Sequence, residues 1–162
     1  MTKEQQLSRA IEIATEAHRN QLDKNGQPYI GHLVRVMSMG RTLDEKICGV
    51  LHDLLEDTAW TAKKLQAEGF DKNIIEAVEC LTKSPNGEYG PYIEGVKLNQ
   101  LATLVKINDL TDNMDIRRLN QIHPEDAERL NRYLIVYREL AESLSVSVHF
   151  IEQVPENNTG GD

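Results

Sequence analysis

The sequence is poor in cysteine, in aromatic residues and in basic charge, and each shortage excludes a class of protein. The 162 residues include two cysteines, Cys48 and Cys80, too few for a disulfide framework or a zinc site built from cysteines. Both lie in apolar helical patterns, so we expect them to pack in the core. The 26 acidic residues outnumber the 18 basic ones, the net charge is −8, and no run of lysine or arginine occurs. This balance argues against a general binder of duplex nucleic acid.

Long apolar runs and β-type alternation are missing as well. No apolar stretch approaches the roughly 18 residues that a membrane-spanning helix needs, so we expect a cytoplasmic protein without a membrane partner. Helical periodicity together with an aromatic content of 5% predicts an all-α fold, a bundle of several helices. The length suits one domain. We expect residues 1–152 to form it and residues 153–162 to be a disordered C-terminal tail.

Helix signals divide the chain into short segments. Thr2 with Gln5, and Thr42 with Glu45, have the spacing of a capping box at a helix start. The pattern predicts helices over residues 2–22, 32–39, 42–58, 61–68, 72–82, 92–116, 124–143 and 146–152. Segments rich in glycine and proline, DKNGQPYIG and SPNGEYGP, predict the two main loops.

The segment CGVLHDLLEDTAW, residues 48–60, carries the strongest functional signal. At about 100° per residue, one helix face collects four polar side chains: His52, Asp53, Glu56 and Asp57. Gly49 lies on the same face and lets another group approach closely. Three acids and an imidazole on two turns repel one another unless a cation offsets them, so a divalent metal explains the pattern economically. An exposed polar face with a hydrogen-bonded histidine would explain it too.

Further ligands elsewhere in the chain favour the metal. His32 begins a predicted helix, and Asp109 lies in LVKINDLTDNM, although a structural histidine and a solvated carboxylate are the simpler interpretations of each alone. Two imidazoles and two carboxylates suit a first-row divalent ion with open positions for water and substrate. Such an ion polarises a phosphoryl oxygen and acidifies a bound water, whose proton Glu56 or Asp57 could take. Lys24 could hold a phosphate. The sequence therefore indicates metal-assisted phosphoester hydrolysis.

These residues, in this order, resemble the H…HD…D signature of the HD superfamily of metal phosphohydrolases, which is an all-α helical bundle. The segments AHRNQLDKNGQPYIGH, LHDLLEDT, VECLTK and VKINDLTDNM narrow the resemblance to the hydrolase domain of the RelA/SpoT family and its single-domain small alarmone hydrolases. By position, the resemblance implies these ligands for the metal, typically manganese: His32, His52, Asp53 and Asp109. It also implies that Glu56 and Asp57 orient and activate the attacking water, and that Lys24 and Asn113 contact the substrate.

The reaction of that family removes pyrophosphate from the 3′ position of guanosine tetra- and pentaphosphate, and single-domain relatives also act as NADPH phosphatases. The resemblance therefore implies a guanosine-3′,5′-bis(diphosphate) 3′-pyrophosphohydrolase whose partner is a small phosphorylated nucleotide. We expect a hydrolase without the synthetase or regulatory domains of the long members. The sequence leaves the oligomeric state open.

The chain departs from the family pattern where the nucleotide is recognised. The family's Arg-Lys pair is Asp23-Lys24 here, and an acid cannot make the cation–π contact of that arginine with guanine. The usual Asp-Arg-Leu-His-Asn reads Asp109-Leu-Thr-Asp-Asn113, which keeps both ends and removes a positive charge near the phosphates. A phosphatase acting on another nucleotide or on NADPH therefore stays open.

The residues also bear on two different classes of protein. A module that senses nucleotides without turnover would not need proton acceptors such as Glu56 and Asp57 beside its metal. A di-iron oxygenase of the same fold would need extra histidine ligands, and three remain: His18, His123 and His149. Tyr89, in the second main loop, could lie over a base or ribose or could simply pack. Three lysines could add phosphate contacts or could be solvated: Lys83, Lys97 and Lys106.

Overall fold

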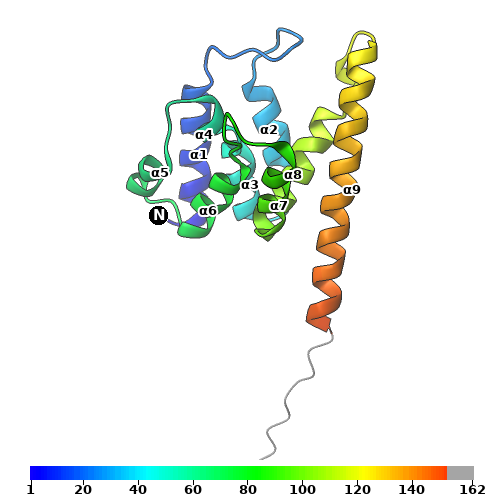
Figure 1. The fold of residues 1–162 in the computed structure, drawn as a ribbon. Helices are drawn as coiled ribbons and strands as arrows, with labels where there is room; N and C mark the ends of the chain where they lie inside the picture. The colour runs from blue at the N-terminus through cyan, green and yellow to red at the C-terminus, as the bar shows by residue number, and fades with distance from the viewer. Residues whose placement is uncertain (153–162) are drawn as a thin grey trace, which may run out of the picture.

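The structure is a computed structural model that describes residues 1–152, with side chains to residue 145. Over these residues the chain is helical without strands, which confirms the predicted all-α fold (Figure 1). The helices are α1 Lys3–Ala17, α2 Ile30–Met39, α3 Leu43–Leu51, α4 Leu54–Asp57, α5 Ala62–Glu68, α6 Lys72–Leu81, α7 Tyr89–Lys97, α8 Gln100–Asn113, the 3-10 helix η1 Ile116–Arg118, and α9 Pro124–Glu152. The predicted tail lies outside the described residues, and the division into one domain stays a prediction.

Helix α3 lies at the centre of the bundle and sets the spacing of its neighbours. It begins at Thr42, whose hydroxyl accepts from the backbone N–H of Glu45 at 3.1 Å, as its capping spacing predicts. It packs against α1, α2, α6 and α8. A Cβ on Gly49 would lie 3.0 Å from the Cα of Met37, so this glycine lets the backbone of α2 approach closely. The close neighbour that the sequence predicted at Gly49 is therefore helix α2.

The single helix predicted over residues 42–58 is wrong in one respect, because the chain breaks at His52 and Asp53. Helix α3 ends at Leu51 and α4 begins at Leu54. The carbonyl oxygen of Gly49, which the backbone of Asp53 would use in a continuous helix, accepts a hydrogen bond from His52 Nδ1 at 2.8 Å. A side chain thus competes with the helix for this acceptor, and Asp53 takes φ −98° and ψ 0°.

Three other predicted boundaries differ from the structure. The first helix ends at Ala17 rather than near residue 22. The segment 92–116 contains two helices, because the side chain of Asn99 accepts from the backbone N–H of Ala102 at 3.0 Å and starts α8 anew. The predicted interruption near residue 144 is absent, and α9 continues to Glu152, projecting beyond the bundle in Figure 1.

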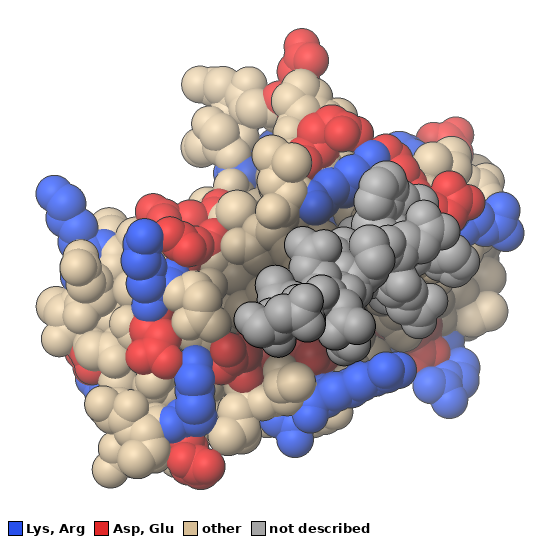
Figure 2. All heavy atoms as spheres, turned by 90° about the horizontal axis from the view of Figure 1, so that it is seen from below, with Lys and Arg blue, Asp and Glu red and all other residues tan. Residues whose placement is uncertain are grey.

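Charged side chains of both signs lie on the face of the molecule that is seen from below (Figure 2). Figure 2 shows acidic and basic side chains interspersed on the face viewed from below, without a large area of one sign. Among the described residues, no helix combines the length and the apolar character needed to cross a lipid bilayer.

Candidate active site

Helices α2 and α8 and the break between α3 and α4 bring the four predicted metal ligands together. The Nε2 atoms of His32 and His52 lie 3.3 Å apart. Asp109 Oδ1 lies 3.2 Å from His32 Nε2 and 3.6 Å from His52 Nε2. Asp53 Oδ2 lies 2.9 Å from His52 Nε2 and 3.8 Å from His32 Nε2. His32, His52 and Asp109 are buried, so this cluster belongs to the interior of the bundle.

The outer nitrogen of each histidine is held by an acceptor. His32 Nδ1 lies 2.7 Å from Asp112 Oδ2, and His52 Nδ1 lies 2.8 Å from the Gly49 carbonyl oxygen. Because both partners accept hydrogen bonds, each Nδ1 carries the proton. In the neutral form of each histidine, Nε2 then points a lone pair into the cluster, which is the tautomer that a metal-binding histidine needs.

The geometry and the charge of the cluster suit a divalent cation. Ligand atoms about 2.1 Å from an ion and at right angles to each other lie about 3 Å apart, close to the separations found here. One ligand atom from each of His32, His52 and Asp109 can be chosen so that all lie within 4.8 Å of one another. Burial opposes a charge on His52, yet Asp53 and Asp109 raise its pKa well above the ordinary range. When no cation is bound, His52 therefore holds a proton on Nε2 as well, and a metal ion would take the place of that proton.

Three donors orient the two carboxylates. Lys106 Nζ lies 2.7 Å from Asp109 Oδ2, and the side-chain amide of Asn113 donates to Asp109 Oδ1 at 2.6 Å. The hydroxyl of Tyr29 donates to Asp53 Oδ2 at 2.5 Å. Lys106, a candidate phosphate contact in the sequence, thus pairs with a predicted metal ligand. The sequence analysis did not single out Tyr29, although its position in PYIG, three residues before His32, places it near the predicted site.

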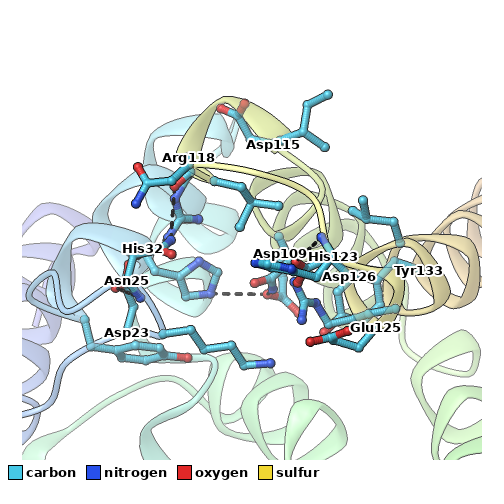
Figure 3. Close-up of a pocket in the computed structure, with 18 of the residues that line it drawn as sticks. Asp23, Asn25, His32, Asp109, Asp115, Arg118, His123, Glu125, Asp126 and Tyr133 are labelled. Carbon is cyan, nitrogen blue, oxygen red and sulfur yellow. Dashed lines mark hydrogen bonds and ion pairs between the residues drawn. The ribbon is translucent and has the colours of Figure 1, made fainter.

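A pocket of about 720 Å³ opens over the cluster. It lies between the loop that precedes α2, the end of α8, and the start of α9. Figure 3 shows His32 and Asp109 facing each other across this space, with Asp126 and Tyr133 of α9 on the side of Asp109. A space of this size accepts a nucleotide.

Three of the four predicted substrate contacts line this pocket, and the fourth does not. Asp23, Lys24 and Asn113 line it. Tyr89 is not among its lining residues; it is 41% exposed, and its ring centre lies 5.9 Å from that of Tyr92.

Asp23 is held by the protein itself. Its Oδ1 accepts from the backbone N–H groups of Asn25 at 2.8 Å and Gln27 at 2.9 Å, and its Oδ2 lies 3.1 Å from Arg118 Nη2. Arg118 Nη1 also donates to Asp112 Oδ2 at 2.6 Å. Arg118 therefore joins the loop that carries Lys24 to the carboxylate behind His32. The sequence did not indicate a role for this arginine, because only the fold brings it close to Asp23, 95 residues away in the chain.

Glu56 and Asp57 follow His52 and Asp53 along the chain and do not line the large pocket. Both are exposed and border a neighbouring cavity of about 650 Å³. Glu56 Oε2 accepts from the backbone N–H of Lys83 at 2.9 Å, and Asp57 Oδ2 accepts from the side-chain amide of Gln21 at 3.2 Å. The break before α4 turns these residues away from the face that a continuous helix would give them.

Asp57 nevertheless acts electrostatically on Tyr29, whose hydroxyl donates to Asp53. Burial raises the pKa of Tyr29, and the charges of Asp53 and Asp57 raise it further, so this hydroxyl keeps its proton for Asp53.

The helical fold and the buried His/Asp cluster agree with the resemblance to HD-type hydrolases that the sequence indicates. No family model matches the chain. It is 30% identical over 155 residues to a guanosine-3′,5′-bis(diphosphate) 3′-pyrophosphohydrolase of Aquifex aeolicus, covering 88% of this chain and 22% of the relative. It is 28% identical over 156 residues to the bifunctional (p)ppGpp synthase/hydrolase SpoT of Escherichia coli K12, covering 86% of this chain and 22% of that protein.

A third relative, a guanosine-3′,5′-bis(diphosphate) 3′-pyrophosphohydrolase of Haemophilus influenzae, is 29% identical over 150 residues, covering 83% of this chain and 22% of the relative. The chain thus spans about a fifth of the length of these relatives. A solved structure described as a metazoan ortholog of SpoT that hydrolyses ppGpp has the same fold, with a TM-score of 0.69 and 21% identity over 86% of this chain and 85% of that one. These likenesses confirm the resemblance to the hydrolase domain of the RelA/SpoT family.

Proposed function

We propose that this chain is a metal-dependent phosphohydrolase that removes pyrophosphate from the 3′ position of guanosine tetra- or pentaphosphate. The observation that carries the proposal is the buried cluster of His32, His52 and Asp109 at the base of the pocket, with both histidines in the tautomer of a metal ligand. The names of the relatives support the choice of substrate.

The metal in this proposal is manganese, held by His32, His52, Asp53 and Asp109. When bound, such an ion supplies a Lewis acid for a phosphoryl oxygen and lowers the pKa of a water. The surrounding side chains keep the ligands in place: Asp112 orients His32, and Asn113 orients the carboxylate of Asp109. Because each ligand is already oriented, little reorganisation is needed when the ion binds.

Asp57, with Glu56, is proposed to take the proton of the attacking water. Both carboxylates are exposed a few residues after the predicted ligands His52 and Asp53, so water has access to them. Lys24, on the loop before α2, is proposed to hold a phosphate of the substrate, since it lines the pocket and is exposed. Tyr89 as a substrate contact stays a prediction, as does the cytoplasm as the location of the protein.

A phosphatase acting on NADPH or another phosphorylated nucleotide is a second candidate, and Asp23 favours it. This acid stands where the family carries the arginine that contacts guanine, and its carboxylate is already engaged by Arg118. Recognition of the base must therefore differ from the family pattern, whereas the phosphate chemistry does not.

A substrate panel with manganese tests both candidates. The metal content of the purified protein is measured first, and release of pyrophosphate and orthophosphate is then followed for guanosine tetraphosphate, guanosine pentaphosphate, NADPH and other 3′-phosphorylated nucleotides. Pyrophosphate released from the guanosine compounds supports the first proposal. Orthophosphate released from NADPH alone supports the second. Binding of the guanosine compounds by the manganese-loaded protein without turnover of any compound would contradict both and indicate a nucleotide sensor.

A further inference from the structure

His18 and Gln21 lie beside the site but have no part in the function proposed so far. His18, just after α1, is 1% exposed, and its ring centre lies 5.6 Å from that of Tyr29. His18 Nδ1 lies 2.6 Å from Gln21 Oε1. Among the described side chains, His18 Nε2 is the buried nitrogen or oxygen atom that lacks a hydrogen-bond partner.

The backbone around Gln21 is fixed on both sides. The Gln21 N–H donates to the carbonyl of His18 at 3.0 Å, and the Gln21 carbonyl accepts from the N–H of Tyr29 at 2.9 Å. The next residue, Leu22, pairs with Pro28 in an isolated β-bridge. The side chain of Gln21 therefore extends from a well-anchored position toward Asp57, 36 residues further along the chain.

The contacts of Gln21 allow two arrangements of its amide, and one is clearly better. With its nitrogen toward Asp57, the amide donates to Oδ2 at 3.2 Å, and its oxygen accepts from His18 Nδ1. The flipped amide would set its oxygen against the carboxylate of Asp57. It would also force the proton of His18 onto Nε2, where a buried N–H would have no acceptor. An unpaired lone pair on Nε2 is the smaller cost, so His18 carries its proton on Nδ1.

We propose that His18 and Gln21 form a hydrogen-bond relay that positions Asp57 for proton transfer. The buried imidazole fixes the orientation of the Gln21 amide, and the amide presents an N–H to one carboxylate oxygen of Asp57. The other oxygen is left to accept a proton from water. Asp57 needs such support because it is exposed and ends the four-residue helix α4. The inference rests on the proposed function, in which Asp57 acts on the attacking water.

Substitutions of His18 test whether the relay needs a donor nitrogen at the position of Nδ1. His18→Leu removes the donor and should lower kcat about five- to tenfold, the value of one hydrogen bond, while KM and metal content stay unchanged. His18→Asn should recover most of the rate, because the Asn amide nitrogen is as many bonds from Cα as Nδ1. His18→Gln places its nitrogen one bond further, at the position of Nε2, and should not recover the rate.

Gln21→Leu provides the second variant, since this side chain is only partly buried and its replacement leaves the core intact. It should lower kcat as much as His18→Leu or more. The double variant should be no slower than Gln21→Leu alone, because the two residues act in series. Additive losses, or a kcat that falls in proportion to thermal stability in every variant, would show a merely structural role and overturn the relay.

A measurement without turnover separates failure of the relay from failure of the proposed function. In the full-length protein, ¹⁵N chemical shifts of His18 should show a protonated Nδ1 and an unprotonated Nε2. The opposite tautomer would overturn the relay even in an active enzyme. If the expected tautomer is found but the manganese-loaded wild type hydrolyses no compound of the panel, the proposed function fails and the role of the relay in catalysis fails with it.

Discussion

The base of the pocket and its mouth are held in place by different means. At the base, His32, His52 and Asp109 are buried and come from helices or helix ends of the central bundle. At the mouth, Asp23 belongs to a loop and Arg118 ends the 3-10 helix η1, and a charged pair between their side chains joins the two segments. The base therefore takes its geometry from core packing, and the mouth from a few polar contacts.

This difference separates the reaction from recognition. A change at the base disturbs packed helices and the predicted metal ligands together, so it affects folding and chemistry at once. A change at the mouth alters partly exposed contacts that contribute little to stability. The mouth can thus acquire a new substrate preference, such as the one that Asp23 indicates, while the reaction is retained. Substitutions at the two places test this separation, beginning with the largest expected effect.

Replacing Asp109 by asparagine should have the largest effect. The substitution keeps the shape and removes the charge that both histidines face. We expect hydrolysis to fall at least about 1000-fold and the bound metal to be lost. Metal content and the hydrolysis rate measure this, with Asp44→Asn as the control, because this half-buried carboxylate in the first turn of α3 pairs with Lys3 and does not line the pocket. Chelation of the wild-type metal should have the same effect, and added manganese should reverse it; an Asp109→Asn variant with normal turnover would contradict the prediction.

Replacing Gly49 by alanine should be next in size. The new Cβ would lie 3.0 Å from Met37 Cα and 3.1 Å from Met37 N, so α2 must move away from α3, and His32 away from His52. We expect a loss of about 1–3 kcal/mol in the free energy of unfolding and weaker metal binding. Urea unfolding and metal titration measure these two quantities.

Gly95→Ala is the matched control for that variant. Gly95 lies inside α7, and a Cβ there would meet no atom within 4 Å. Alanine should therefore stabilise the protein by about 0.5–1 kcal/mol through helix propensity. If Gly49→Ala were also neutral or stabilising, the spacing of α2 and α3 would not depend on this glycine.

Arg118→Ala tests the mouth. It releases Asp23 and the loop that carries Lys24, so we expect KM to rise about tenfold while kcat changes little. Metal content should fall slightly at most, since Arg35 still holds Asp112. Steady-state kinetics measure the two constants separately.

The neighbouring Arg117→Ala is the control for Arg118→Ala. Arg117 is 87% exposed in its side chain and pairs with Asp115 alone. It should leave both kinetic constants unchanged. A drop in kcat equal to the rise in KM for Arg118→Ala would mean that the mouth and the base are not separable.

Asp23→Asn should have the smallest effect, and the effect should depend on pH. Burial raises the pKa of Asp23, but hydrogen bonds from the backbone of Gln27 and Asn25 and the contact with Arg118 lower it below its ordinary value. A lowered folded-state pKa means that the carboxylate stabilises the fold above the unfolded pKa of about 3.9, and that this stability is lost as the pH falls through the folded value. We expect the stability of the wild type to exceed that of Asp23→Asn by about 1 kcal/mol at most at neutral pH, with the difference shrinking as the pH falls below about 4 and vanishing below the folded pKa. Urea unfolding across this pH range measures it, and a constant difference would contradict the assigned cause.

Local features of the sequence predicted most of the fold. Helical periodicity and side-chain caps act over a few residues, so the starts at Thr2 and Thr42 were visible without a structure. The break at His52 was not, because it depends on which donor wins the carbonyl of Gly49. Helical periodicity takes no account of such a competition and therefore predicts a continuous helix through residues 52 and 53.

The site was predictable in its residue types and less so in its contacts. The order of His32, His52 and Asp109 indicated a cluster that the fold brings together. The partners of these residues could not be predicted in the same way, since Asp112 and Arg118 obtain their roles from contacts between distant segments. The exposed position of Asp57 follows from the break before α4, which a helical projection of the sequence cannot represent.

The hydrogen bond between His52 and the carbonyl of Gly49 has one further consequence. A single peptide oxygen both orients the imidazole and lies where α3 ends, so the axis of α4 need not continue that of α3. The short segment that ends in Asp57 is held instead by contacts with Lys83 and Gln21. The predicted ligands and the proposed proton acceptors therefore depend on different parts of the fold for their positions.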